Sequence, residues 1–303
     1  MMNETTDERK AQRIGMICAV SSMFVWGVMP IYWRALIPID PFIIILYRIV
    51  LTAVTCGVAV LKVYGIAGIK APLKNKKTIA MLFAAGCLIV ISWSVYVAAV
   101  HAGQTIQTSI GYYMNPLAVC MLGMIFFKER LTKYKLIAIV FACMGVLVLL
   151  VHFMRLPTIA LTLAIVFAIY AAIKKHLKIQ AIVSLFYETA FLAMITFPVI
   201  VYFEATGRGA IHAGEPHQFI MLLFSGIATA TPLILFAIAA NRISMVSLGM
   251  IVYISPSIKL LISIFLFREP FDFGQLVAIM IIWIGLAFFT YGEIRGTSTK
   301  IES

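Results

Sequence analysis

Three ionisable side chains lie inside long apolar stretches of this 303-residue chain: Arg48, Glu188 and Lys259. Insertion scales give a cost of about 2.5 to 3.5 kcal/mol for a charged residue at the centre of a bilayer, so such groups usually face a partner or a watery cavity. A buried carboxyl group beside a cation can take up and release a proton. We therefore expect the three residues to line one polar pathway, with Glu188 as a candidate for proton coupling.

Each of these charges also has a structural interpretation. Arg48 lies six residues into its apolar stretch and could instead extend its guanidinium to the headgroup region. Glu188 could be a salt-bridge partner of Lys259, a role that does not exclude proton exchange. His101 closes an apolar stretch, where it is either a second candidate for proton coupling or a hydrogen-bonded boundary residue.

Aromatic side chains accompany the charges. Trp26, Trp93 and Tyr96 lie within apolar stretches and offer flat faces to an aromatic or amphipathic solute. Aromatic residues are also common at membrane interfaces. Trp26 and Trp93 are both more than one helical turn inside their stretches, which favours a place in the pathway.

Two prolines interrupt apolar stretches, and a tyrosine stands three residues before each: Tyr113 before Pro116, and Tyr253 before Pro256. Proline removes a backbone donor and clashes with the preceding turn, so both positions predict helix kinks. Membrane helices tolerate kinks where polar groups satisfy the freed carbonyls, and Asn115 is a suitable neighbour. An ordinary packed kink is the alternative, but the duplicated motif favours a role in the pathway.

The proline motif belongs to a repeat with a fixed offset of 140 residues, in which the recurring residues are uncommon types and no gap is needed. Arg48 and Glu188 are equivalent positions under this offset. The chain is therefore two copies of one unit. The matching pairs are Arg34 and Lys174, Gly86 and Gly226, Tyr113 and Tyr253, Pro116 and Pro256, Lys128 and Arg268, Glu129 and Glu269, and Gly145 and Gly285.

The composition is that of a membrane protein. Hydrophobic residues make up 63% of the chain and charged residues 12%, with a mean hydropathy of +1.04, whereas soluble domains carry about 25% charged residues. A spanning helix needs about 20 mainly apolar residues, and the apolar runs here are continuous rather than alternating. The sequence predicts an all-α integral membrane protein with ten transmembrane helices. They are expected at roughly 14–36, 42–64, 78–101, 106–127, 136–153, 157–173, 181–203, 218–240, 245–267 and 273–292.

The basic residues are concentrated in alternate loops. Of the 24 lysines and arginines, 17 fall in the tails and alternate loops, and three fall in the loops between them. This bias predicts a multi-pass protein of the cell membrane with both termini cytoplasmic, and the net charge of +12 then requires no nucleic-acid partner. Five spans per unit is an odd number, so the second repeat is inverted. The expected division is a tail at 1–13, repeats at 14–153 and 154–293, and a tail at 294–303.

Two acidic residues mark equivalent helix ends in this topology. Glu129, beside Lys128, lies in a predicted inner loop, and Glu269, beside Arg268, lies in a predicted outer loop. Such charges are candidates for gates, or for solvated anchors that set the topology and contribute little energy. The duplication alone does not distinguish a gate from an anchor.

Motifs for catalysis and metal binding are absent from the sequence. It has no nucleotide-binding loop, no Gly-x-Ser-x-Gly elbow and no His-Glu-x-x-His pair, and its loops are too short for a catalytic domain. The five cysteines have no metal-ligand spacing. We therefore expect no enzymatic activity, no metal and no cofactor.

Several stretches of the chain together carry a family likeness. They are Phe24-Val25-Trp26-Gly27, Ser92-Trp93, Ser109-Ile110-Gly111-Tyr112-Tyr113-Met114-Asn115-Pro116-Leu117, Glu188-Thr189, Thr231-Pro232-Leu233 and Tyr253-Ile254-Ser255-Pro256. In this order they resemble the drug/metabolite transporter superfamily with its tandem EamA-type units, and within it the RarD-like permeases of the chloramphenicol-sensitive protein family. The resemblance implies a ten-helix permease that exports small metabolites or drugs. Two positions depart from the family pattern: His101 stands in place of an asparagine, and Lys259 in place of an uncharged residue.

Inverted repeats with intramembrane charges predict a secondary active carrier that works by alternating access, with its substrate near the midplane. Arg48 and Lys259 outweigh Glu188, which favours an amino-acid-like or other carboxylate-bearing metabolite as the substrate, and the family resemblance implies that it is exported. The alternative substrate is a neutral aromatic drug such as chloramphenicol, held by the aromatic residues above. A membrane scaffold or a channel is the alternative class. The expected partners are a small-molecule substrate, the lipid bilayer and protons as coupling ions, and the oligomeric state is left open.

Overall fold

The computed structural model describes residues 2–70, 72, 75–127, 133–154, 156–177, 179–240, 242–243 and 251–301, and these residues contain helices and no strand. The helices are α1 (Met2–Arg34), α2 (Pro41–Lys70), α3 (Lys76–His101), α4 (Thr105–Phe127), α5 (Lys133–Phe153), α6 (Thr158–Leu177), α7 (Ala181–Ala205), α8 (Ala210–Ala213), α9 (Pro216–Leu223), α10 (Ser225–Ala240), α12 (Ile254–Leu261), the π-helical η2 (Ile262–Leu266) and α13 (Phe273–Ile301).

Most of the predicted spans appear as apolar helices. Six stretches are long and apolar enough to cross a membrane: Lys10–Arg34, Pro41–Ile66, Lys76–His101, Ala181–Ala205, Pro216–Ala240 and Phe273–Gly292. Three shorter apolar helices cover Leu136–His152, Thr158–Lys174 and Ile254–Leu266, and α4 covers the predicted span at 106–127. The prediction of an all-helical, multi-pass membrane protein is therefore confirmed.

The first and last helices extend beyond their predicted spans. α1 already begins at Met2, and α13 continues to Ile301. Glutamate, lysine and arginine are good helix formers, so a polar segment next to an apolar span can continue its helix outside the bilayer. The residues assigned to the two tails are thus largely helical extensions of the spans.

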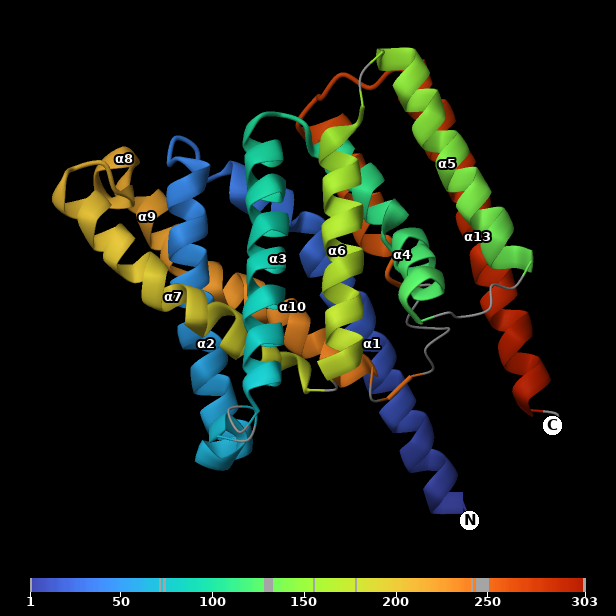
Figure 1. Ribbon diagram of the computed structural model, residues 1–303, viewed down its shortest axis with the longest axis horizontal. Coiled ribbons are helices and arrows are strands. Elements are labelled where there is room, and N and C mark those ends of the chain that lie inside the picture. The colour runs from blue at the N-terminus through green and yellow to red at the C-terminus, as the bar shows by residue number, and fades with distance from the viewer. Residues whose placement is uncertain are drawn as a thin grey trace.

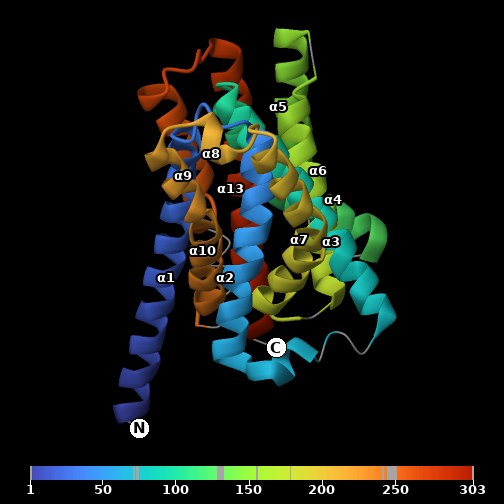
Figure 2. The ribbon, with the colours of Figure 1, turned by 90° about the vertical axis from the view of Figure 1, so that its left-hand side faces the viewer.

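Successive long helices alternate in direction, so the two termini lie at the same end of the bundle (Figure 1). The view at right angles shows α8 and α9 at the opposite end from both termini (Figure 2). A common end for both termini is what an even number of membrane crossings requires.

α2 and α7 pack side by side in antiparallel directions. Phe42, near the start of α2, contacts Phe203, near the end of α7, with ring centroids 6.0 Å apart. Tyr47 donates a hydrogen bond to Glu204 Oε1 over 2.7 Å. The start of each helix therefore lies beside the end of the other.

α5 and α13 form a second antiparallel pair, at the edge of the bundle (Figure 1). A Cβ atom on Gly145 would lie 3.1 Å from the carbonyl oxygen of Ala278, and one on Gly285 would lie 3.0 Å from that of Ala138. Small residues let membrane helices approach this closely. Both glycines and both alanines are separated by 140 residues, so the two helices present matching surfaces to each other.

Other helix contacts come in pairs that correspond under the same offset. α3 packs on α6 and α7, whereas α10 packs on α1 and α2. α4 packs on α6, whereas α12 packs on α1. Exchanging the first five predicted spans with the last five converts each of these contacts into its counterpart.

Candidate functional site

Arg48 lies in α2 against two tryptophan rings. Its Cζ is 4.1 Å from the ring centroid of Trp93 and 4.4 Å from that of Trp33. Its Nε donates to Oγ1 of Thr229 on α10 over 3.0 Å. The side chain is buried inside the bundle, and its Nη1 has no hydrogen-bond partner among the described residues. The guanidinium is therefore held by cation–π contacts and keeps a donor available.

Lys259 of α12 is the second buried cation, and tyrosine rings surround it. Its Nζ is 3.6 Å from the ring centroid of Tyr112 and 4.9 Å from that of Tyr96. The two tyrosine rings contact each other edge-on, with centroids 5.8 Å apart, and Lys259 lies within the electrostatic influence of Arg48. Both cations therefore belong to one group of side chains. We call it the cation–aromatic cluster: Arg48, Lys259, Trp33, Trp93, Tyr96 and Tyr112.

Neither cation of the cluster has an acidic partner among the described residues. The six acidic side chains that the structure describes are engaged elsewhere: Asp40 with the Phe42 amide, Glu188 with Lys174, Glu204 with Tyr47, Glu215 in the cap of α9, Glu269 with α4 and Asp272 with the Gln275 amide. Burial of a charge without a counter-charge is costly. The cluster is therefore a site that a bound anion would stabilise.

Glu188 lies in a separate polar group. It is fully buried, and its carboxylate accepts hydrogen bonds from Lys174 Nζ over 2.7 Å, from the Tyr170 hydroxyl over 3.0 Å and from the Ser184 hydroxyl. The suggested salt bridge between Glu188 and Lys259 is not formed, because the charged partner of Glu188 among the described residues is Lys174. Arg48 lies seven residues after the start of α2, and Glu188 lies seven residues after the start of α7. Each is therefore about 10 Å from the start of its own helix. Because the two helices are antiparallel, the two residues lie towards opposite ends of the pair.

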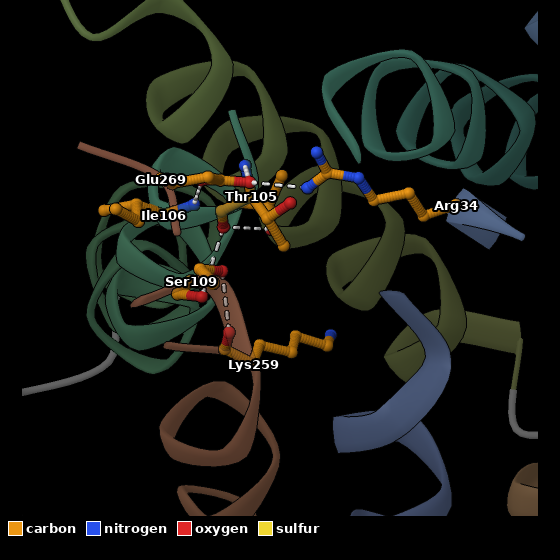
Figure 3. A network of polar contacts seen from close by, with 8 residues as sticks. Arg34, Thr105, Ile106, Ser109, Lys259 and Glu269 are labelled. Atoms are coloured by element: carbon orange, nitrogen blue, oxygen red, sulfur yellow. Dashed lines mark hydrogen bonds and ion pairs between the residues drawn. The ribbon is translucent and has the colours of Figure 1, made fainter. Parts of the chain in front are cut away.

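Glu269 binds the start of α4. Its Oε1 accepts the backbone N–H of Thr105 and its Oε2 that of Ile106, both over 2.9 Å, and Arg34 Nη1 lies 4.0 Å from Oε1 (Figure 3). A carboxylate at a helix N-terminus satisfies unpaired donors and interacts favourably with the helix dipole. We call Glu269, Arg34 and these two amides the Glu269 clamp, which joins the end of α1 to the start of α4.

The clamp is connected to the cation–aromatic cluster through η2. The backbone N–H of Glu269 donates to the Ser263 carbonyl over 3.0 Å, and the Ser263 hydroxyl donates to the Lys259 carbonyl over 2.7 Å. Lys259 takes part in this link through its backbone carbonyl, whereas its side chain runs sideways, to the right in Figure 3. Arg268, beside Glu269, has a φ of 51°, a conformation that costs a non-glycine residue energy and often occurs at functional sites.

Tyr113 and Tyr253 lie in a pocket of about 600 Å³ between α4, α12 and α13, and neither belongs to the cation–aromatic cluster. The Tyr113 hydroxyl is 2.7 Å from the Ser257 hydroxyl, and the Tyr113 ring contacts Trp283 edge-on at 5.8 Å. None of the described residues that line this pocket is charged. Its lining residues are Tyr113, Tyr253, Ser257, Trp283, Leu286, Ala287, Thr290 and Tyr291.

The remaining predicted residues of the pathway are Trp26, Asn115 and His101. Trp26 packs against Phe236, with ring centroids 5.9 Å apart. Asn115 is buried, and its Oδ1 has no partner among the described residues. The Nε2 of His101 donates to the Trp33 carbonyl over 2.7 Å and so ties the end of α3 to the end of α1.

The two predicted kink prolines differ in their positions. Pro116 lies inside α4, whereas Pro256 lies in the first turn of α12, where the missing N–H breaks no helical hydrogen bond. Glu129 falls outside the described residues.

Several residues of these groups were not anticipated as site residues, among them Trp33, Tyr112, Tyr170, Lys174 and Thr229. Two of them had a usable signal in the sequence. Tyr170 and Lys174 are four residues apart, so they share a helix face. Lys174 also matches Arg34 under the 140-residue offset, and both are basic residues that contact a glutamate.

Comparison with known proteins supports a transporter. The EamA-like transporter family matches this chain twice, at residues 13–151 and 157–291. The uncharacterized transporter YojE of Bacillus subtilis is 32% identical, over 93% of this chain and 95% of that protein. Protein RarD of Escherichia coli is 30% identical, over 95% of this chain and 97% of that protein.

A solved crystal structure shares the fold at low sequence identity. It superposes with a TM-score of 0.61, is 13% identical, and covers 90% of this chain and 96% of its own. Since both halves match the same family and the likeness to YojE and RarD spans nearly the whole chain, this protein belongs to the EamA-like transporter family.

Proposed function

We propose that this protein is a secondary active transporter that exports a small carboxylate-bearing metabolite across the cell membrane. The carrying observation is the cation–aromatic cluster, in which Arg48 and Lys259 are buried together without an acidic partner among the described residues. An anion about 4 Å from one such cation gains about 4 kcal/mol at an effective dielectric constant of about 20. The available Nη1 donor of Arg48 suits a carboxylate oxygen.

Alternating access between two inverted five-helix repeats, at 14–153 and 154–293, is the proposed mechanism. It is supported by the double match to one family at 13–151 and 157–291 and by helix contacts that correspond under exchange of the halves. The common end of the two termini (Figure 1) and the basic residues of alternate loops support a topology with both termini cytoplasmic.

The Glu269 clamp is the proposed outer gate. It ties the end of α1 to the start of α4, and its link to Lys259 through Ser263 connects the gate with the substrate site. Movement of Lys259 on substrate binding would therefore reach the clamp through two hydrogen bonds.

We assign proton coupling to Glu188, because it is the most deeply buried acid that the structure describes. Lys174, with 20% of its side chain exposed, is its charged partner. Protonation of the carboxylate would remove the charge that holds Lys174 and would free α6 to move relative to α7.

A neutral aromatic drug is the second candidate substrate, and the uncharged pocket of Tyr113, Tyr253 and Trp283 favours it. An aromatic compound without charge would gain ring contacts there and nothing from Arg48 or Lys259.

Transport by purified protein in liposomes tests the proposal. Uptake of phenylacetate should saturate and should be accelerated by the same compound loaded on the other side, since counterflow distinguishes a carrier from a channel. Uptake no faster than in protein-free vesicles, together with saturable uptake of chloramphenicol, would favour the neutral drug. Linear, unsaturable flux of both compounds would contradict a carrier.

A further inference from the structure

We infer that the cation–aromatic cluster selects organic anions that lack an amino group, so that aromatic carboxylates are substrates and amino acids with the same aromatic body are not. This selectivity rests on the proposed transport function and narrows its substrate class. The selectivity follows from the contacts that the cluster can make with the carboxylate group and with the ammonium group of a zwitterion.

The carboxylate end of a ligand finds several donors. Arg48 Nη1 and the hydroxyls of Thr52, Tyr96 and Ser225 are all buried without a hydrogen-bond partner among the described residues. Thr52 lies four residues after Arg48 on α2, and Ser225 lies four residues before Thr229 on α10. Residues four apart share a helix face, so the hydroxyls of Thr52 and Ser225 flank the Arg48–Thr229 contact. A buried polar group without a partner is costly, and a bound carboxylate would satisfy several at once.

The ammonium end of a ligand finds no counter-charge among the described side chains. Every acidic side chain that the structure describes already has another partner, and Glu188, the most deeply buried, is bound to Lys174. Aromatic faces are the usual neutral acceptors for an ammonium group. In this cluster each of the four rings already holds one of the protein's own cations.

The body of the ligand is expected to be apolar or aromatic. Trp33, Trp93 and Tyr96 belong to the largest apolar core of the described bundle, together with aliphatic residues such as Leu36 and Val97. A polar body would lose its hydration there without regaining hydrogen bonds. Aromatic carboxylates therefore match the site at both ends.

Four compounds with one ring test the selectivity: phenylacetate, phenylalanine, phenethylamine and phenylacetamide. Their binding to purified protein is measured by quenching of tryptophan fluorescence, because Trp33 and Trp93 lie in the cluster, and their transport is measured by competition with labelled phenylacetate in liposomes. Phenylacetate should bind, and phenylalanine should bind at least about tenfold more weakly, a difference of about 1.4 kcal/mol.

The variant Lys259→Gln removes one cation and should reduce the discrimination between phenylacetate and phenylalanine. Lys62→Gln, which removes an exposed charge from α2, is the matched control and should leave it unchanged. The comparison of the four compounds on the unmodified protein decides the case even if Lys259→Gln does not fold.

The outcomes separate this selectivity from the proposed function. Equal transport of phenylacetate and phenylalanine, or transport of phenylalanine alone, overturns the selectivity and leaves carboxylate transport standing. Binding of phenylacetamide without binding of phenylacetate overturns both.

Discussion

Arg48 and Glu188 lie at opposite ends of the antiparallel pair α2 and α7, each seven residues after the first residue of its helix. The two positions are equivalent under the 140-residue offset, yet their environments are unlike. Arg48 stacks on tryptophans, whereas Glu188 binds a lysine. The two repeats thus hold polar sites at different depths, one built around a cation and one around an acid, and of these two the site at Arg48 lacks a counter-charge among the described residues.

Replacement of Arg48 by glutamine should lower carboxylate transport by about 10- to 100-fold, because a hydrogen bond to a charged group contributes about 1.5 to 3 kcal/mol. Initial rates of phenylacetate uptake into liposomes measure the effect. Lys62→Gln is the control, since Lys62 is exposed on the same helix. Equal loss in both variants would mean that Arg48 has no specific role.

Replacement of Glu188 by glutamine should destabilise the protein, because it leaves Lys174 without its charged partner. Loss of one member of a buried ion pair costs about 3 to 5 kcal/mol, and the partial exposure of Lys174 should keep the cost at the lower end. Thermal unfolding in detergent measures it. The double variant Glu188→Gln/Lys174→Met should recover most of the lost stability.

The same double variant tests the assignment of proton coupling. Transport by the unmodified protein should respond to an imposed pH gradient, and transport by Glu188→Gln/Lys174→Met should not. An unchanged response would assign the coupling to a group other than Glu188.

Glu269→Gln should weaken the attachment of α4, because it removes the charge at the N-terminus of that helix. The expected cost is about 0.3 to 1 kcal/mol, measured by thermal unfolding. Glu215→Gln is the comparison: Glu215 caps α9 at an exposed position, so water should reduce its effect.

A gate and a structural anchor predict different effects of Glu269→Gln on the solvent accessibility of the start of α4. Loss of a gate should increase this accessibility, whereas loss of an anchor should only lower the stability. In a background without the five native cysteines, Thr105→Cys should react faster with a membrane-impermeant thiol reagent when Glu269 is also replaced. Lower stability with an unchanged labelling rate would identify the clamp as an anchor.

Trp283→Ala should separate the two candidate substrate sites. Trp283 lines the uncharged pocket with Tyr113 and Tyr253, and an aromatic pair contributes about 0.5 to 1.5 kcal/mol beyond its buried area. Binding of chloramphenicol should therefore weaken about two- to tenfold, while phenylacetate transport should not change. Trp93→Ala should show the reverse pattern, and the same pattern in both variants would argue against two sites.

The sequence predicts the helical membrane fold well, because the bilayer itself determines the length of the continuous apolar runs and the placement of the basic loops. It also identifies Arg48 and Lys259, since each is a charge inside an apolar run. That they share one cluster depends on the packing of several helices around Trp33, Trp93, Tyr96 and Tyr112, which no spacing along the chain specifies.

Tyr112 and Tyr113 show why the repeat alone misplaces part of the site. The repeat marks Tyr113 as a candidate site residue because it matches Tyr253. Adjacent residues on a helix point about 100° apart, so Tyr112 and Tyr113 face different neighbours. In the structure Tyr112 faces Lys259, whereas Tyr113 faces the pocket of Trp283. The duplicated tyrosine thus marks the second pocket, and its unduplicated neighbour reaches the cation.

The paired glycines of α5 and α13 have a consequence for motion. Gly145 packs against Ala278, and Gly285 packs against Ala138. The contact is therefore symmetric, because each half of the chain contributes the same two residue types to it. If the two halves exchange conformations during transport, a contact that is symmetric between the halves is the same before and after the exchange. The α5–α13 pair can therefore keep the same contact in both conformations, so that the other helices move relative to this pair.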